Sequence, residues 1–185
     1  MKNSHVPNHV MIDLETMGTR ADSAIVSIGA VVFDPRLNKV GKRDTKMTFY
    51  TELDWEFDQD RHICPDTANW WSKQSVEARS ALNGLDSLDT SLVELANWLP
   101  KDAKVWGNGA IFDIGMLENA YQQYGIPIPW KFWNVRDCRT VKDMYESARG
   151  GWDGKVGGVA HNALDDALHQ AQYICKMWTS LLEVK

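Results

Sequence analysis

The sequence predicts an α/β fold with a mixed central sheet flanked by helices, and three observations support this. Apolar runs typical of strands fill residues 10–14, 25–33 and 46–53, and helical patterns that alternate with single short strands follow them. The chain has 185 residues, 44% hydrophobic and 24% charged, which fits one domain with a substantial core. No internal repeat or linker divides it. We therefore expect a flexible N-terminus at 1–8 and a single domain at 9–185.

The first predicted strand carries two carboxylates at its end. Alternation along a strand places successive side chains on opposite faces, here Val10, Ile12 and Leu14 against Met11, Asp13 and Glu15. Two carboxylates so close repel each other unless something neutralises them. A divalent cation such as Mg²⁺ or Mn²⁺ does so, since these ions prefer oxygen ligands. The alternative is a pair of exposed acids on an edge strand.

The next two strands complete an antiparallel unit. Residues 25–33 are nearly all apolar, which is typical of a central strand covered on both faces, and Asp34-Pro35 ends it. Residues 46–53 form the third strand. Three strands in direct succession predict an antiparallel meander.

The rest of the chain alternates helices with short strands. The predicted helices are a short one opened by Pro65, 87–99, one between Gly109 and Gly125, 139–148, and 163–182. Short strands are predicted at 103–106 and 132–135. The segment Gly150–Val159 contains five glycines, so we expect it to be mobile.

The bulk composition narrows the class of protein. A net charge of −5 argues against broad binding of duplex nucleic acid, but not against chemistry at the end of a strand. Cys64, Cys138 and Cys175 have no metal-binding spacing, so reduced thiols in a cytoplasmic protein are the simplest interpretation. No signal-peptide pattern and no membrane-spanning apolar run is present, so no membrane partner is expected.

Nine tryptophans are many for this length. Trp70 and Trp71 form one cluster, and Trp130 and Trp133 form another. Such clusters occur in cores and on surfaces that stack bases. We expect core positions for most of them, Trp70 included.

Two further segments carry candidate functional residues. Asp113 falls in the first turn of a helix that follows Asn108-Gly109, where the helix dipole alone also favours an acid. The segment from His161 to Ala167 holds a histidine and Asp166, which also fits a capped helix start with a surface histidine.

Together, these segments resemble the DEDDh family of 3′-5′ exonucleases, which have an RNase H-like fold. The matching motifs are D-x-E-T at 13–16, N-x-x-x-F-D at 108–113 and H-x-A-x-x-D-A at 161–167, in the family's order. Residues 106–109 and 134–140 look most similar to the phage and prophage branch, which includes exonuclease A and exoribonuclease-like proteins. Met17 departs from the pattern, because many members have a second threonine there.

The resemblance implies two-metal hydrolysis of phosphodiesters at the 3′ end of single-stranded nucleic acid, releasing nucleoside 5′-monophosphates. It favours DNA as substrate and implies two Mg²⁺ ions, with Mn²⁺ as a substitute. Asp13 would touch both ions, Glu15 and Asp166 the first, and Asp113 the second. His161 would be the general base.

Helical periodicity distinguishes the two neighbouring aspartates. At about 100° per residue, Asp166 lies at the edge of the broad apolar arc of the last helix. Asp165 lines up with His169, Gln172 and Lys176 on a solvated face. The helix is therefore expected to turn Asp166 toward the protein and Asp165 toward water.

Five residues beside the acids are candidates for substrate contacts: Leu14, Thr16, Met17, Asn108 and Phe112. The first three follow or interleave the metal acids and are placed to touch the terminal nucleotide. Asn108 either contacts substrate or caps its own helix, and Phe112 either stacks on a base or packs in the core.

Other functions fit the same residues. An exoribonuclease or an RNase H-type endonuclease would use the same metals, and the spacing from His161 to Asp166 favours the exonuclease. A non-catalytic nucleic-acid-binding module would not need all five catalytic side chains. A nucleotide triphosphate site at Gly154-Lys155 is rejected, because the run lacks the Lys-Ser/Thr ending of a phosphate loop.

Overall fold

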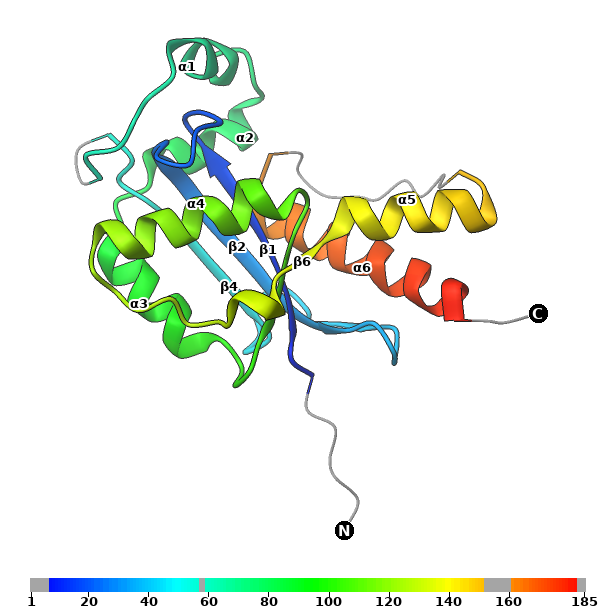
Figure 1. The fold of residues 1–185 in the computed structure, drawn as a ribbon. Coiled ribbons are helices and arrows are strands. Elements are labelled where there is room, and N and C mark those ends of the chain that lie inside the picture. Colours follow the sequence, from blue (N-terminus) through cyan, green and yellow to red (C-terminus); the bar gives the residue numbers. More distant parts are fainter. Residues whose placement is uncertain (1–6, 57–58, 152–160, 183–185) are drawn as a thin grey trace.

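The structure is a computed structural model that describes residues 7–56, 59–151 and 161–182. It confirms the α/β class and the mixed sheet (Figure 1). The strands are β1 (His9–Thr16), β2 (Ile25–Asp34), β3 (Lys39–Val40), β4 (Thr48–Glu52), β5 (Lys104–Gly107) and β6 (Arg136–Asp137). The helices are α1 (Pro65–Trp71), α2 (Val76–Arg79), α3 (Leu88–Trp98), α4 (Ala110–Gln123), α5 (Cys138–Arg149) and α6 (Ala163–Leu182), with short 3₁₀ turns at Ser80–Asn83 and Phe132–Asn134.

The sheet has the order β3-β2-β1-β5-β6, and β4 also pairs with β2. The predicted meander is confirmed, since β1, β2 and β4 are antiparallel neighbours. Parallel pairing of β1 with β5, and of β5 with β6, makes the sheet mixed. Every residue of β2 is buried, as its continuous apolar sequence requires.

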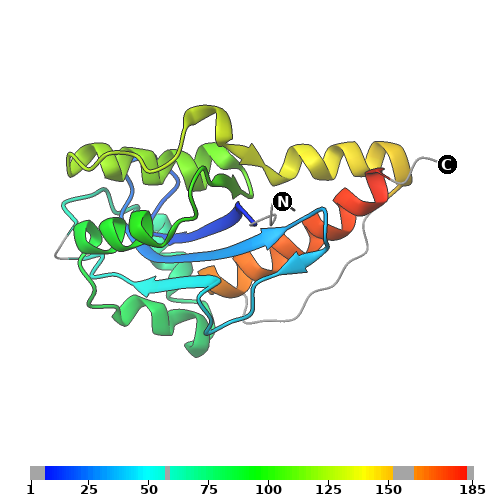
Figure 2. The ribbon, with the colours of Figure 1, turned by 90° about the horizontal axis from the view of Figure 1, so that it is seen from below.

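Helices cover both faces of the sheet, and α4 and α6 lie on opposite sides of it (Figure 2). The even-numbered apolar residues of β1 join the core formed with α3 and α4. Met11 instead joins the core formed with α6. The predicted alternation of β1 is therefore confirmed, and it sends Asp13 and Glu15 toward the face of α6.

One predicted element is wrong. The strand expected at 132–135 is a 3₁₀ turn at Phe132–Asn134, followed by the two-residue strand β6. The residues that pair with Trp106 and Gly107 of β5 are Arg136 and Asp137, which directly follow the predicted strand. The sequence also gave no sign of β3, whose two residues become a strand only by pairing with the end of β2.

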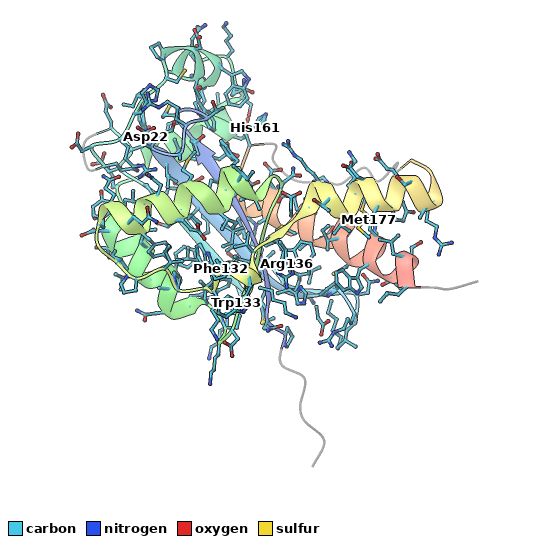
Figure 3. All side chains as sticks on the ribbon, in the orientation of Figure 1. Asp22, Phe132, Trp133, Arg136, His161 and Met177 are labelled. Carbon is cyan, nitrogen blue, oxygen red and sulfur yellow. The ribbon has the colours of Figure 1, made fainter. Side chains whose placement is uncertain are left out.

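The tryptophan pairs divide between core and surface. Trp71 and Trp130 are buried, whereas Trp70 is 40% exposed and Trp133 is 59% exposed. The expected core position of Trp70 is therefore wrong. Phe132, Trp133 and Arg136 lie together on the connection from α4 to α5 (Figure 3).

Several expectations fall at the margins of the structure. Most of the Gly150–Val159 segment lies outside the described residues, as do residues 1–6 of the expected flexible N-terminus. Asn8, the last residue of that N-terminus, accepts a hydrogen bond on its backbone oxygen from the backbone N–H of Lys104. All three cysteines are free. Among the described residues, no helix combines the length and the apolar character that a membrane span requires.

Candidate active site

Three carboxylates converge at the end of β1. Asp13 and Glu15 project from β1, and Asp166 projects from the first turn of α6. One ligand oxygen of each lies within 4.8 Å of the others. The structure thus brings together acids that are about 150 positions apart in the sequence, as the motif match predicts.

A glycine in the middle of β2 permits this approach. Gly29 pairs with Asp13 across the sheet, and a Cβ on Gly29 would lie 2.2 Å from the backbone of Ala163 and Leu164. Any side chain there would push the start of α6 off the sheet. Gly29 therefore sets the distance between Asp166 and the acids of β1.

Asp113 is the fourth acid, and α4 brings it in from the other side of β1. Its side chain is 3% exposed and accepts hydrogen bonds from the backbone N–H groups of Leu14 and Asn108. A Cβ on Gly107 would lie 2.8 Å from its Oδ2. Asp113 is thus fixed against β1 by backbone groups.

Burial and mutual repulsion make these acids hold protons strongly. Burial raises the pKa of Glu15 to about 8, with the charges of Asp166 and Asp113 adding to the effect. Burial also raises the pKa of Asp113 to about 7, although its backbone hydrogen bonds oppose the rise. The pKa values of Asp13 and Asp166 are raised as well, chiefly by burial. A divalent cation stabilises such a cluster in place of protons, so the oxygen-rich donor set fits Mg²⁺ or Mn²⁺.

His161 stands at the edge of the cluster. Its backbone N–H donates a hydrogen bond of 3.2 Å to Asp166 Oδ2, and its φ of +64° is a left-handed conformation. The imidazole packs edge-on against Trp70, with ring centroids 4.8 Å apart. His161 thus lies at the end of the molecule where α1 and α2 sit (Figure 3).

The two aspartates of α6 have different partners, as the helical periodicity predicts. Asp166 faces the acid cluster, whereas Asp165 forms an ion pair with Arg43. Arg43 also reaches the side chain of Asn162 at 3.4 Å. Asn162 in turn donates a hydrogen bond of 3.0 Å to the hydroxyl of Tyr50. The turn that carries His161 is therefore joined to β4 by the hydrogen bond between Asn162 and Tyr50.

The predicted substrate residues fall into two groups. The side chains of Leu14, Thr16 and Met17 are buried and face the protein. Their contact with the terminal nucleotide stays a prediction. Asn108 does not cap its helix, because the cap residue is Gly109, which lacks a side chain. Phe112 is partly buried against the core and lines an open cavity.

Gln170 is a site residue that the sequence analysis missed. It is 6% exposed and donates a hydrogen bond of 2.7 Å from Nε2 to Asp13 Oδ1. It lies one helical turn after Asp166, so its spacing on α6 was the available signal. Tyr50 gave no such signal, since only the tertiary structure brings it to Asn162.

The comparisons with known proteins agree with this geometry. The sequence model of the family described as "3′-5′ exoribonuclease Rv2179c-like domain" matches residues 8–178. The chain is also 27% identical to an exodeoxyribonuclease of Enterobacteria phage T4, over 84% of this chain and 82% of the phage protein.

Solved structures share the fold at low sequence identity. The nuclease domain of 3′hExo, a DEDDh family member bound to rAMP, matches with a TM-score of 0.61 and 14% identity, over 98% of this chain and 96% of that one. S. pombe Pop2p with Mg²⁺ and Mn²⁺ matches at 0.63 and 16%, over 92% and 82%. The nuclease CRN-4 matches at 0.67 and 13%, over 93% of this chain. E. coli exonuclease I in complex with a dT13 oligonucleotide matches at 0.66 and 14%, over 95% of this chain. The chain spans only 64% of CRN-4 and 42% of exonuclease I.

Proposed function

Since the chain belongs to the family of 3′-5′ exoribonuclease Rv2179c-like domains and is a 3′-5′ exonuclease of the DEDDh type, we propose that its substrate is single-stranded DNA. The convergence of Asp13, Glu15 and Asp166 within 4.8 Å supports metal-dependent hydrolysis of a phosphodiester, which both kinds of nucleic acid share. The similarity to the phage T4 exodeoxyribonuclease supports DNA. RNA is the second candidate, because the description of the family names an exoribonuclease.

Two divalent cations, Mg²⁺ or Mn²⁺, fit the acid cluster. Asp13 would contact both, Glu15 and Asp166 would complete the first site, and Asp113 would serve the second. When bound, the ions would supply the positive charge that lowers the barrier to hydrolysis of an anionic phosphodiester. Gln170 would hold the Asp13 carboxylate in one orientation through its 2.7 Å hydrogen bond.

The remaining chemistry is assigned to His161. A water would attack the phosphorus of the last phosphodiester, and an imidazole nitrogen of His161 would accept its proton. The bond from phosphorus to the 3′ oxygen of the preceding nucleotide would break, and that oxygen would keep the electron pair and take a proton from solvent water. The products would be a nucleoside 5′-monophosphate and a strand shortened by one nucleotide with a new 3′ hydroxyl.

Substrate and direction are tested with DNA and RNA oligonucleotides of the same sequence, each labelled at the 5′ end. With Mg²⁺ we expect a ladder that shortens one nucleotide at a time from the 3′ end, faster for DNA, and no products with EDTA. Faster shortening of RNA would establish the second candidate. Internal fragments, or no cleavage of either strand, would contradict the proposal.

The general base is tested with His161→Ala. Loss of a positioned base lowers kcat by roughly 10²–10⁴-fold, with KM largely kept. Imidazole added to the buffer is expected to restore part of the lost rate in this variant. The matched control is His169→Ala on α6, the helix that follows His161, and it should keep its rate and gain nothing from imidazole. An unchanged rate in His161→Ala would remove the assignment.

A further inference from the structure

An open cavity of about 620 Å³ lies beside the acid cluster. Its wall is formed by the turn after β1, the first turn of α4 and the first turn of α5, through Thr19, Ile111, Phe112, Asp137 and Arg139 among others. The helices α4 and α5 start next to each other and run in opposite directions (Figures 1 and 2). None of the three converging carboxylates lines this cavity, so it lies outside the centre where a phosphodiester would be cut.

Arg139 places a positive charge in the cavity. Its side chain is exposed and lies over Gly109, where a built Cβ would be 3.5 Å from the guanidinium carbon. Its guanidinium makes no hydrogen bond or ion pair with any residue that the structure describes, although its charge acts at longer range to lower the pKa of Asp113. Arg43, by contrast, is held by Asp165. Arg139 is therefore a cation free to bind an anion beside the active site.

The wall of this cavity also carries apolar side chains. Ile111 is 94% exposed at the start of α4, and Phe112 is partly buried beside it. The one acid in the wall, Asp137, accepts hydrogen bonds from the backbone N–H groups of Ala110 and Thr140. These helix N-terminal groups offset its charge. An apolar wall facing a guanidinium suits a ligand with a flat apolar part and a phosphate.

The chemistry of a strand end decides which nucleotide fits. The 5′ phosphate of the terminal nucleotide is the one that is cut, and its 3′ side ends in an uncharged hydroxyl. The next phosphate belongs to the nucleotide that precedes it. Apart from the phosphate that is cut, which the cations of the acid cluster would hold, a cation in the cavity can bind only a phosphate of the preceding nucleotides.

We propose that the cavity binds the nucleotide preceding the 3′-terminal one, with Arg139 on its phosphate and with Ile111 and Phe112 against its sugar or base. This inference rests on the proposed function and adds a second binding site to it. It makes the enzyme read two nucleotides of the strand, while the chemistry needs only one.

Two substrates separate the sites. An oligodeoxythymidylate fills both, whereas the p-nitrophenyl ester of thymidine 5′-monophosphate has one phosphate, and its aromatic leaving group replaces the preceding nucleoside without supplying a second phosphate. Arg139→Ala should raise KM for the oligonucleotide roughly tenfold, the order of a lost charge-assisted hydrogen bond. KM for the ester should change far less, because the ester has no second phosphate, and any effect through the charge of Asp113 should appear in kcat for both substrates. The slope of log(kcat/KM) against log salt should also flatten by about 0.7, as for one lost phosphate contact on a single strand.

Lys142→Ala is the matched control. It removes the same charge from the same helix, and its exposed side chain forms an ion pair of 3.7 Å with Glu146. It should change neither substrate's constants. Equal effects of Arg139→Ala on KM for ester and oligonucleotide, or no effect on either, would overturn the inference.

Ile111→Asp tests the apolar wall without risk to the fold. An acid in the first turn stabilises a helix, so the melting temperature should be kept or raised. The carboxylate would repel the phosphate, so KM for the oligonucleotide should rise more than KM for the ester, which has no second phosphate. An unchanged KM for the oligonucleotide would show that the strand does not pass this wall.

Binding without turnover separates this inference from the proposed function. Anisotropy of a 5′-fluorescein oligodeoxythymidylate is measured with Asp13→Asn, alone and combined with Arg139→Ala. Weaker binding by the double variant supports the cavity even if the wild-type protein cuts nothing. Equal binding by the two proteins would refute the cavity even if the wild type is an exonuclease.

Discussion

The carboxylate of Asp137 joins the starts of two helices, because its Oδ2 accepts a hydrogen bond of 2.6 Å from the backbone N–H of Ala110, the first residue of α4. Its Oδ1 accepts from the backbone N–H of Thr140 at 3.0 Å and so caps α5. One side chain thus fixes the first turn of α4, which carries Asp113, against the start of α5.

Asp137→Ala should therefore destabilise the protein and loosen Asp113 together. Loss of an N-cap costs about 1 kcal/mol, and the N–H of Ala110 loses its partner as well, so we expect about 1–3 kcal/mol. Urea unfolding measures the free energy of unfolding, with exposed Asp143→Ala on α5 as the control. Equal stability of the two variants would show that the double cap contributes nothing.

Gln170→Leu should separate stability from metal binding. The Oε1 of Gln170 is buried without a hydrogen-bond partner among the described residues, so leucine should keep or raise the melting temperature of the metal-free protein. Loss of the hydrogen bond to Asp13 should lower Mg²⁺ or Mn²⁺ affinity roughly 10–100-fold, the usual effect of losing an outer partner of a metal ligand. Calorimetric metal titration measures this. Exposed Gln172→Leu on α6 is the control, and equal metal affinity in both variants would contradict the role.

Asp166→Asn and Asp165→Asn should behave differently despite being neighbours. Asp166 faces the acid cluster, so its loss should lower the metal-dependent rate more than 100-fold, beyond the effect of an outer partner. Asp165 lies outside the acid cluster and forms an ion pair with Arg43, a contact worth about 1 kcal/mol of stability. Rates with saturating Mn²⁺ are compared, and equal losses would refute the assignment from the helix face.

Tyr50→Phe should act through His161. The hydroxyl of Tyr50 accepts the 3.0 Å hydrogen bond of Asn162, the residue after His161. Its loss should lower kcat roughly 2–10-fold at unchanged KM, the effect of one net hydrogen bond on the position of the base. In a His161→Ala background the same substitution should have no further effect. An equal loss in both backgrounds would show that Tyr50 only stabilises the fold.

The metal-free protein should lose stability as pH rises from 6.5 to 8. The pKa values of Glu15, about 8, and Asp113, about 7, lie above their ordinary values, so the folded state holds protons that the unfolded chain has released. Each such proton lowers the free energy of unfolding by about 1.4 kcal/mol per pH unit. His9 adds nothing in this window, because burial lowers its pKa to about 4 and its contribution is lost only below pH 6.5.

Melting temperatures with EDTA between these pH values measure the effect. Asp13→Asn removes one repelling charge, so its slope should be smaller and its stability at pH 8 higher. Mg²⁺ should also reduce the slope in the wild type, since cations replace the protons. A flat profile with EDTA would contradict the strong coupling of these acids.

The sequence by itself predicted most of the strands and helices, and it singled out the acids. Alternation in β1 separates Asp13 from its apolar neighbours, and the helical period of α6 separates Asp166 from Asp165, because both periods follow from local backbone geometry. The three motifs then predicted the four acids and His161 as site residues without any coordinates.

The tertiary structure alone decided what lies beside them. The sequence does not distinguish the neighbours Trp70 and Trp71, yet in the structure Trp71 is buried and Trp70 packs against His161. The cavity at Arg139 exists because Asp137 brings the starts of two helices together, and α6 reaches β1 because Gly29 has no side chain. These relationships depend on contacts between residues far apart in the chain, which local periodicity does not encode.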